Sequence, residues 1–122
     1  KTGARKIRFL YELMANIYKN AKADLTANTA TTVYTVPSDS RSIVKSIIVS
    51  EDSGNADSIT LTITDASSNV FSLFKTKAVS ANATVELLSQ PLVLQESEIL
   101  KATAATANRL HIVVSVLEIN RS

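Results

Sequence analysis

Apolar and polar side chains alternate along residues 58–64, where Ile59, Leu61 and Ile63 are separated by hydroxyl residues. Successive side chains of a strand point to opposite faces, so a period of two predicts a strand with one dry and one wet face. β-Branched residues favour this structure, and turn-forming residues such as Gly54 and Asn69 stand on either side. We therefore expect residues 58–64 to form a half-buried antiparallel strand.

The same alternation recurs through most of the chain. It predicts further strands over residues 23–26, 31–36, 42–50, 69–75, 84–89, 92–94, 99–103 and 110–119. Pro37 and Pro91 break the pattern, because proline has no N–H to donate to a ladder. Short strands joined by turns at intervals of about ten residues require two layers to cover their apolar faces. We predict an all-β fold, an antiparallel β-sandwich or jelly roll of about eight strands.

Two of these strands are apolar on both faces. Residues 42–50 include Ile43, Val44, Ile47, Ile48 and Val49, which predicts a central strand covered on both sides. In residues 110–119, one face is formed by Leu110, Ile112, Val114, Val116 and Glu118, and the other by His111, Val113, Ser115, Leu117 and Ile119. We expect this last strand to lie inside a sheet or to face a neighbouring subunit.

Residues 4–23 follow a different spacing. Apolar residues recur there at steps of three and four, at Ile7, Leu10, Tyr11, Met14, Ile17, Tyr18 and Ala21. Such steps predict an amphipathic helix, so we divide the chain into an N-terminal helix or arm over residues 1–22 and a β-sandwich domain over residues 23–122. Met14 opens a run typical of a protein start. We therefore hypothesise that the native product begins at Met14 and that residues 1–13 are an upstream extension or a gene-model artefact. An intact mass of the natural protein that includes residues 1–13 would contradict this.

The formal net charge of +2 is unevenly distributed. Residues 1–22 hold six basic residues and one acidic residue, whereas the rest of the chain holds seven basic and ten acidic residues. A basic segment can contact nucleic acid or an acidic protein surface. The interleaved aromatic and arginine residues that read bases do not continue into the domain, so the sequence favours a solvated terminus over a nucleic-acid partner. No run approaches the roughly 18 apolar residues of a membrane-spanning helix, and we expect no membrane partner.

Residues that bind metals are few. Cysteine is absent, which excludes a disulfide framework and a thiolate site. His111 is the only histidine, and one histidine without cysteine cannot build a conventional zinc site. Glu51, Asp52 and Asp57 crowd one predicted loop but lack the spacing of a calcium loop. We expect no metal-ligating residues and no cofactor.

Patterns typical of catalysis are also missing. Gly3 and Gly54 are the only glycines, too few for a phosphate-binding loop. Glu96 and Glu98 lie two apart in a predicted turn without an apolar pocket suited to acid catalysis. No serine has the surroundings of a nucleophile elbow. We predict that the protein has no catalytic residues and is not an enzyme.

Several stretches resemble small β-sandwich virion proteins of tailed phages, especially marine ones. The opening TVYTVP at residues 32–37, the strand IVKSI at residues 43–47, and LVL at residues 92–94 before a Glu-containing turn carry the resemblance. It extends over about residues 16–120. It implies a virion protein assembled in the host bacterial cytoplasm: a capsid decoration or head-fibre protein, or a tail or neck accessory.

The resemblance also implies partners. It suggests a homo-oligomer, as a trimer or higher ring, bound to major capsid or tail proteins. The interface and anchor candidates are Ile7, Leu10, Met14, Ile17, Val113, Leu117 and Ile119.

The alternative interpretation is a carbohydrate-binding or adhesin module. Such a module would use loop tips such as residues 51–56 and 77–83 to bind a cell-surface glycan. Tyr18, Tyr34, Phe71 and Phe74 could also form a platform for sugar or base stacking, although so few aromatic residues more often fill a core.

Overall fold

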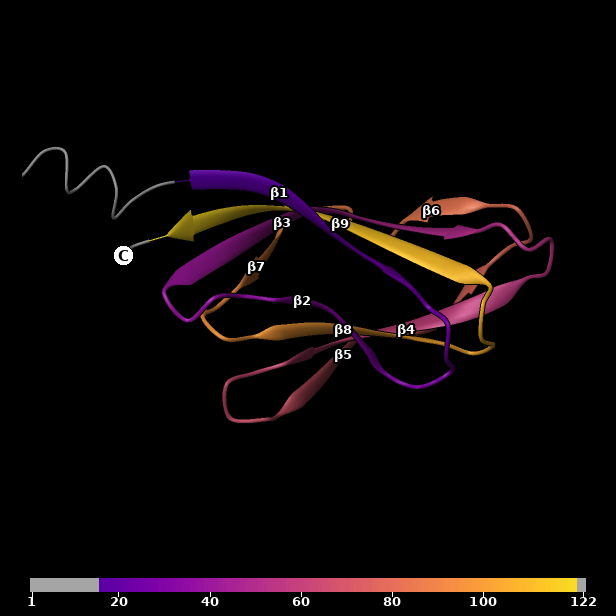
Figure 1. Cartoon of the computed structure of the whole chain (residues 1–122), viewed down its shortest axis with the longest axis horizontal. Helices are drawn as coiled ribbons and strands as arrows, with labels where there is room; N and C mark the ends of the chain where they lie inside the picture. Colours follow the sequence, from indigo (N-terminus) through magenta and orange to yellow (C-terminus); the bar gives the residue numbers. More distant parts are fainter. Residues whose placement is uncertain (1–15, 121–122) are drawn as a thin grey trace, which may run out of the picture.

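The computed structural model describes residues 16–120, in which nine β-strands form two antiparallel sheets and no helix occurs (Figure 1). Sheet A has the order β1 (Asn16–Asp24), β9 (Leu110–Asn120), β3 (Ser40–Glu51), with β6 (Thr84–Glu86) and β7 (Leu92–Leu94) both paired to the free edge of β3. Sheet B has the order β2 (Thr31–Thr35), β8 (Ile99–Ala104), β4 (Asp57–Thr64), β5 (Val70–Val79). The predicted two-layer all-β fold is confirmed.

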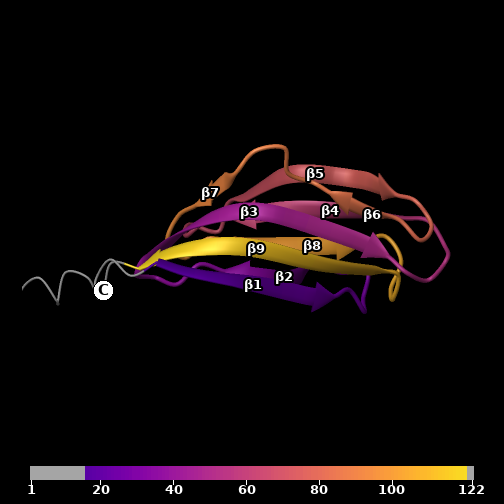
Figure 2. The same ribbon diagram turned by 90° about the horizontal axis from the view of Figure 1, so that it is seen from above.

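The strands β6 and β7 behave as one interrupted strand. They pair with β3 at Ile48–Ser50 and at Ser42–Val44, and Pro91, which has no N–H, lies in the gap. Counting them once, the chain passes between the sheets as in an eight-stranded jelly roll. Figure 2 shows β1, β9 and β3 side by side in sheet A, so β9 is an interior strand as predicted.

The core lies between the inner faces of the two sheets. Its fully buried side chains include Leu25, Val44, Ile47, Val49, Ile59, Leu61, Leu94, Leu100, Leu110, Ile112 and Val114. Fully burying one such aliphatic side chain stabilises the fold by about 1.5–3 kcal/mol. The predicted dry faces of β4 and β9 therefore form the core, and Glu118 continues the β9 face with only 5% exposure.

A bulge divides β3 and reverses the alternation of its inward-facing residues. Its pairing with β9 shifts between Val44 and Ser46, so Lys45 is an extra residue. Before the bulge the buried residues are even-numbered, as at Val44, and after it they are odd-numbered, as at Ile47 and Val49. One extra residue reverses the alternation, which is how a bulge keeps both halves of a strand facing the core.

The helix predicted over residues 4–23 is wrong from Asn16 onward, where the chain forms β1 and pairs with β9 along nine residues. A step of four residues fits both a helical period of 3.6 and a strand period of two, so the spacing between Ile17 and Ala21 could not distinguish them. Pairing with the open edge of β9 decides for the strand. β1 crosses the predicted boundary at residue 22. Residues 1–15, with Ile7, Leu10 and Met14, lie outside the described residues, so the predicted division into arm and domain stays a prediction.

Candidate functional site

The outer face of sheet A is built from rows of cross-strand neighbours. Paired residues of antiparallel strands share a face, and one row runs across four strands as Tyr18, Leu117, Ile43 and Val93. A second row runs Lys22, Val113, Ile48 and Glu86. Between them lies a polar row of Asn20, Ser115 and Ser46. We call these rows the apolar row, the charged-end row and the polar row.

The apolar side chains of these rows are exposed to different extents, and Leu117 and Ile43 are half-buried. Tyr18 is 76% exposed and Val93 55%, and the interior-strand residues Val113 and Ile48 are each 37% exposed. The sequence predicted that β3 would be covered on both sides, but within the described residues only its inner face is covered. Apolar side chains that are exposed together on the interior strands of a sheet often belong to an interaction surface.

The outer face of sheet B carries more hydroxyl side chains than that of sheet A. One of its rows runs Thr32, Lys101, Thr62 and Ser72. Thr60 and Thr103 are paired on the same face. Hydroxyl side chains hydrogen-bond to water and need no cover, so this part of the face suits solvent. The row at one end of the face is mixed: it runs Thr35, Ile99, Thr64 and Val70, and Val70 is 63% exposed.

The predicted interface candidates fall in two places. Val113, Leu117 and Ile119 lie together on the outer face of β9, Ile119 being 38% exposed. Ile17 pairs with the inward-facing Glu118 and therefore lies on the opposite face of β1, at the rim of the core. Their role as an interface remains a prediction.

The two ends of the charged-end row carry opposite charges. Lys22 is exposed on the edge strand β1, and Glu86 is exposed on β6 at the other edge. The Glu86 carboxylate accepts a hydrogen bond from the Ser46 hydroxyl, and also from the backbone N–H of Ile47 at 2.7 Å and of Leu88 at 3.2 Å. Although partial burial acts the other way, these bonds lower the pKa of Glu86. At the end of β6, the Glu86 carboxylate therefore accepts the hydrogen bonds of the Ile47 and Leu88 N–H groups in place of a backbone carbonyl.

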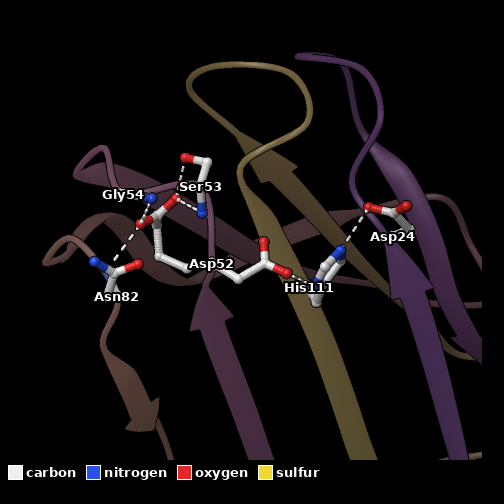
Figure 3. A network of polar contacts seen from close by, with 7 residues as sticks. Asp24, Asp52, Ser53, Gly54, Asn82 and His111 are labelled. Carbon is white, nitrogen blue, oxygen red and sulfur yellow. Dashed lines mark hydrogen bonds and ion pairs between the residues drawn. The ribbon is translucent and has the colours of Figure 1, made fainter.

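His111 lies at one end of the outer face of sheet A, between two carboxylates (Figure 3). Its Nε2 is 3.1 Å from Oδ1 of Asp24 on β1, and its Nδ1 is 3.6 Å from Oδ2 of Asp52 in the loop after β3. A general base needs one ring nitrogen free to take a proton from a nucleophile. Both nitrogens face carboxylates here, so His111 joins the edge strand to the loop.

Glu51, one of the three carboxylates considered as a calcium site, is only 2% exposed and hydrogen-bonds within its own loop. Its carboxylate accepts hydrogen bonds from the Ser53 hydroxyl and from the backbone N–H groups of Ser53 (2.7 Å), Gly54 (3.1 Å) and Asn82 (2.9 Å) (Figure 3). Burial favours the neutral acid, but the hydrogen bonds outweigh it and lower the pKa of Glu51 to about 2. The carboxylate thus ties the β3–β4 loop to the β5–β6 turn.

A second polar network crosses the core between the sheets. The Tyr34 hydroxyl of β2 donates to Oε2 of Glu118 on β9 at 2.5 Å and lies 2.6 Å from the Ser42 hydroxyl. Lys19 forms an ion pair with the same Glu118 oxygen at 3.1 Å. Burial, reinforced by the bond to Glu118, raises the pKa of Tyr34. The sequence pattern hinted at an inward-facing Glu118 but gave no sign of its tyrosine partner, because the two lie 84 residues apart.

The four aromatic residues considered as a stacking platform do not share a surface. Tyr18 lies on the outer face of sheet A, and Tyr34 is buried in the core. Phe71 and Phe74 belong to β5 of sheet B and pair with the inward-facing side of β4. The platform would need these side chains on one face, and the fold separates them.

The remaining chemical candidates do not assemble. Within residues 16–120, no three acidic or histidine side chains are grouped as metal ligands, and no helix has the length and hydropathy needed to span a bilayer. Glu96 and Glu98 are half-buried in the β7–β8 turn, where Glu98 accepts a hydrogen bond from the Gln95 N–H at 2.7 Å. Shallow depressions on sheet A lie beside His111 and beside Tyr18.

No protein-family model and no curated protein matches the chain. Among solved structures it is similar to a subunit of Bacillus endospore appendages, described as disulfide-linked pili, with a TM-score of 0.55, 12% identity and coverage of 89% of this chain and 91% of that one. It is similar to a capsid chain of Helicobacter pylori bacteriophage KHP30, with a TM-score of 0.51, 13% identity and coverage of 88% and 89%.

A further similarity is to a chain of the infectious bursal disease virus particle, with a TM-score of 0.54 and 11% identity. There the match covers 87% of this chain but only 31% of the viral chain. At these identities the likeness shows a shared fold: the described domain is a jelly-roll sandwich of the kind found in viral capsids and in a pilus.

Proposed function

We propose that the protein is a non-enzymatic structural component of a virus particle, specifically a capsid decoration or head-fibre protein of a tailed phage. It would act by repeated contacts with copies of itself and with a larger shell. The sequence resemblance to tailed-phage virion proteins supports the finer assignment, and the fold shared with capsid chains is compatible with it.

One observation carries the proposal: the outer face of sheet A presents an apolar row across four strands, with Tyr18 and Val93 exposed at its ends and Leu117 and Ile43 half-buried between them. Burying apolar surface yields about 25 cal/mol per Å², so this face gains free energy when a neighbour covers it. Contiguous apolar patches on a protein surface are often functional, and this row is a candidate for such a contact. Many weak contacts between identical subunits add up in a symmetric particle.

The arrangement around His111 leaves neither ring nitrogen free for a general base. Both of its ring nitrogens are directed at carboxylates, which holds the end of β1 against the β3–β4 loop. The pilus subunits with the same fold are described as disulfide-linked. This chain has no cysteine, so its own assembly would depend on non-covalent contacts.

The test is composition of the particle. Virions purified from the natural host on a density gradient should contain the protein at a fixed ratio to the major capsid protein, measured by quantitative mass spectrometry. Disassembly into heads and tails should leave it with the heads. Recovery only from the unassembled lysate would contradict a virion role, and recovery with tails would move the protein to a tail accessory.

The proposed role of residues 1–22 as an anchor to an acidic capsid surface is tested in the same preparation. The proposed trimer is tested separately, by sedimentation of the purified chain. A variant that lacks residues 1–15 leaves β1 intact and should be lost from particles if the anchor holds them. Unchanged occupancy would place the attachment on the sandwich itself.

A further inference from the structure

We infer that the outer face of sheet A pairs with the same face of a second copy about a two-fold axis parallel to the strands. The inference adds a symmetry and a register to the proposed structural role. The pairing itself can be tested on the purified chain, and only its recurrence in a particle rests on the proposed function.

The charged-end row is self-complementary under this symmetry. A two-fold axis parallel to the strands places each row of one copy over the same row of the other copy. The strands of the second copy then run across the face in the reverse order. Lys22 on β1 then faces Glu86 on β6 of the second copy, and the reverse pair forms at the other edge. Opposite charges face each other twice in one interface, while Val113 and Ile48 cover each other in the middle.

The apolar row is also matched. Reversal places Tyr18 over Val93 of the second copy and Leu117 over Ile43, so hydrocarbon meets hydrocarbon along the whole row. A two-fold axis across the strands would instead exchange the two rows. It would place Glu86 over Val93 and leave a carboxylate against an apolar side chain, which costs free energy. In these two rows the charges therefore favour the axis along the strands. The row that pairs Arg41 with Ile119 has no such match, since reversal places Arg41 over Ile119 of the second copy.

The size of the face predicts a weak pair. Strands lie about 4.8 Å apart and rise about 3.4 Å per residue, so the face measures roughly 15 Å by 27 Å, or about 400 Å² per copy. Two copies would bury roughly 800 Å² in total, which is below the roughly 1,000 Å² of a stable specific interface and is in the range of weak, transient contacts. We expect monomers at a few micromolar, dimers at about 100 μM and above, and stable pairing only where other contacts in an array add to this one.

The main experiment uses cysteine cross-linking, because the chain has no cysteine of its own. Tyr18→Cys and Val93→Cys are made as separate variants, mixed at high concentration and treated with a short thiol-to-thiol cross-linker. The expected product is a covalent dimer of one variant with the other. Each variant alone should give little product, since the two Tyr18 positions would lie at opposite edges of the interface.

Cross-linking of Tyr18→Cys with itself would overturn the inferred axis, and absence of any product up to millimolar concentration would overturn the pairing. A trimer in analytical ultracentrifugation that is lost on Leu117→Lys would assign this face to a three-fold contact. Each of these outcomes leaves the particle composition test of the proposed function unaffected.

The charge pairs have a test of their own. Lys22→Glu places like charges together twice and should weaken the dimer at least tenfold, with the effect reduced at high salt. Lys77→Glu on the exposed edge of sheet B makes the same change of net charge away from the face and is the control. Equal effects of the two variants would contradict the pairing of Lys22 with Glu86.

Discussion

The two outer faces of the sandwich differ in a way that the two inner faces do not. Both inner faces are aliphatic, as at Ile112 on sheet A and Leu100 on sheet B. Outside, sheet A carries the apolar row that includes Leu117 and Ile43, whereas sheet B carries Thr62 and its hydroxyl neighbours. Folding explains the inner faces but not the difference outside. The proposed contact of sheet A with a second copy would account for this difference.

The largest effect should separate folding from association on a single strand. Ile112→Ala removes a fully buried side chain of β9 and should lower the free energy of unfolding by about 2–5 kcal/mol. Val113→Ala, one residue along and 37% exposed, should cost under about 1 kcal/mol in dilute solution. Urea unfolding measures both. Similar losses for the two variants would mean that the outer face of β9 serves the stability of the monomer.

The next effect concerns association and compares the outer faces directly. Leu117→Lys puts a charge in the centre of the apolar row and should weaken self-association by at least tenfold, about 1.4 kcal/mol. Thr62→Lys makes the matched change at a half-buried position on sheet B and should leave association unchanged. Sedimentation of both variants across a concentration series provides the measurement, and a drop with Thr62→Lys would place the interface on sheet B.

A smaller effect is expected when sheet B is made to resemble sheet A. The double variant Thr62→Ile and Lys101→Leu gives sheet B an apolar pair in neighbouring strands. Such a patch should cause new, concentration-dependent association and lower solubility, with little change in unfolding. Light scattering against the parent chain tests this. If the variant is as soluble as the parent, the hydroxyl residues on the outer face of sheet B are not needed to prevent association through that face.

The smallest effect is the dependence on acid. Glu51 closes the loop after β3 with its pKa lowered from 4.5 to about 2, because its hydrogen bonds outweigh the effect of burial. A lowered pKa adds stability that is present above about pH 4.5 and is lost as the pH falls toward 2. Glu51→Gln should be less stable than the parent at neutral pH and should lose this part of the acid dependence. Unfolding curves between pH 7 and pH 2 check it.

Asp65 offers the matched comparison on sheet B. Its carboxylate accepts hydrogen bonds from the backbone N–H groups of Ser67 and Asn69, both at 2.9 Å, and the backbone bond from Asn69 is the main cause of its lowered pKa. Asp65 is half-buried, so Asp65→Asn should change the acid dependence less than Glu51→Gln. A larger change with Asp65→Asn than with Glu51→Gln would show that the β4–β5 turn contributes more to the acid dependence of stability than the β3–β4 loop.

Much of the fold could be predicted because strands leave a local signal. The alternation in residues 58–64 and 110–119 located β4 and β9, and it correctly placed Glu118 with the buried residues. The signal failed where two periods coincide: the steps of four through Ile17 and Ala21 suit a helix and a strand equally, and only the open edge of β9 decides between them. The bulge at Lys45 was missed for a related reason, since its effect is to shift a register that exists only between strands.

The candidate surface was predicted in part. The sequence indicated the outer residues of β9 as interface candidates, because a long strand with apolar residues on both faces is expected to contact a second layer or a neighbouring subunit on its outer side. Its partners Tyr18, Ile43 and Val93 were not, since they come from three other strands and meet only through pairing.

The sequence by itself determined which side chains share a face of each strand, because the direction of a side chain follows from the geometry of neighbouring residues. It also determined that neither cysteine chemistry nor a phosphate loop is possible, because the residues needed are absent. The tertiary structure alone decided which faces lie together. Strand order and register join residues far apart in the chain, as in the bond from Tyr34 to Glu118 and the row from Lys22 to Glu86, and no local pattern carries that information.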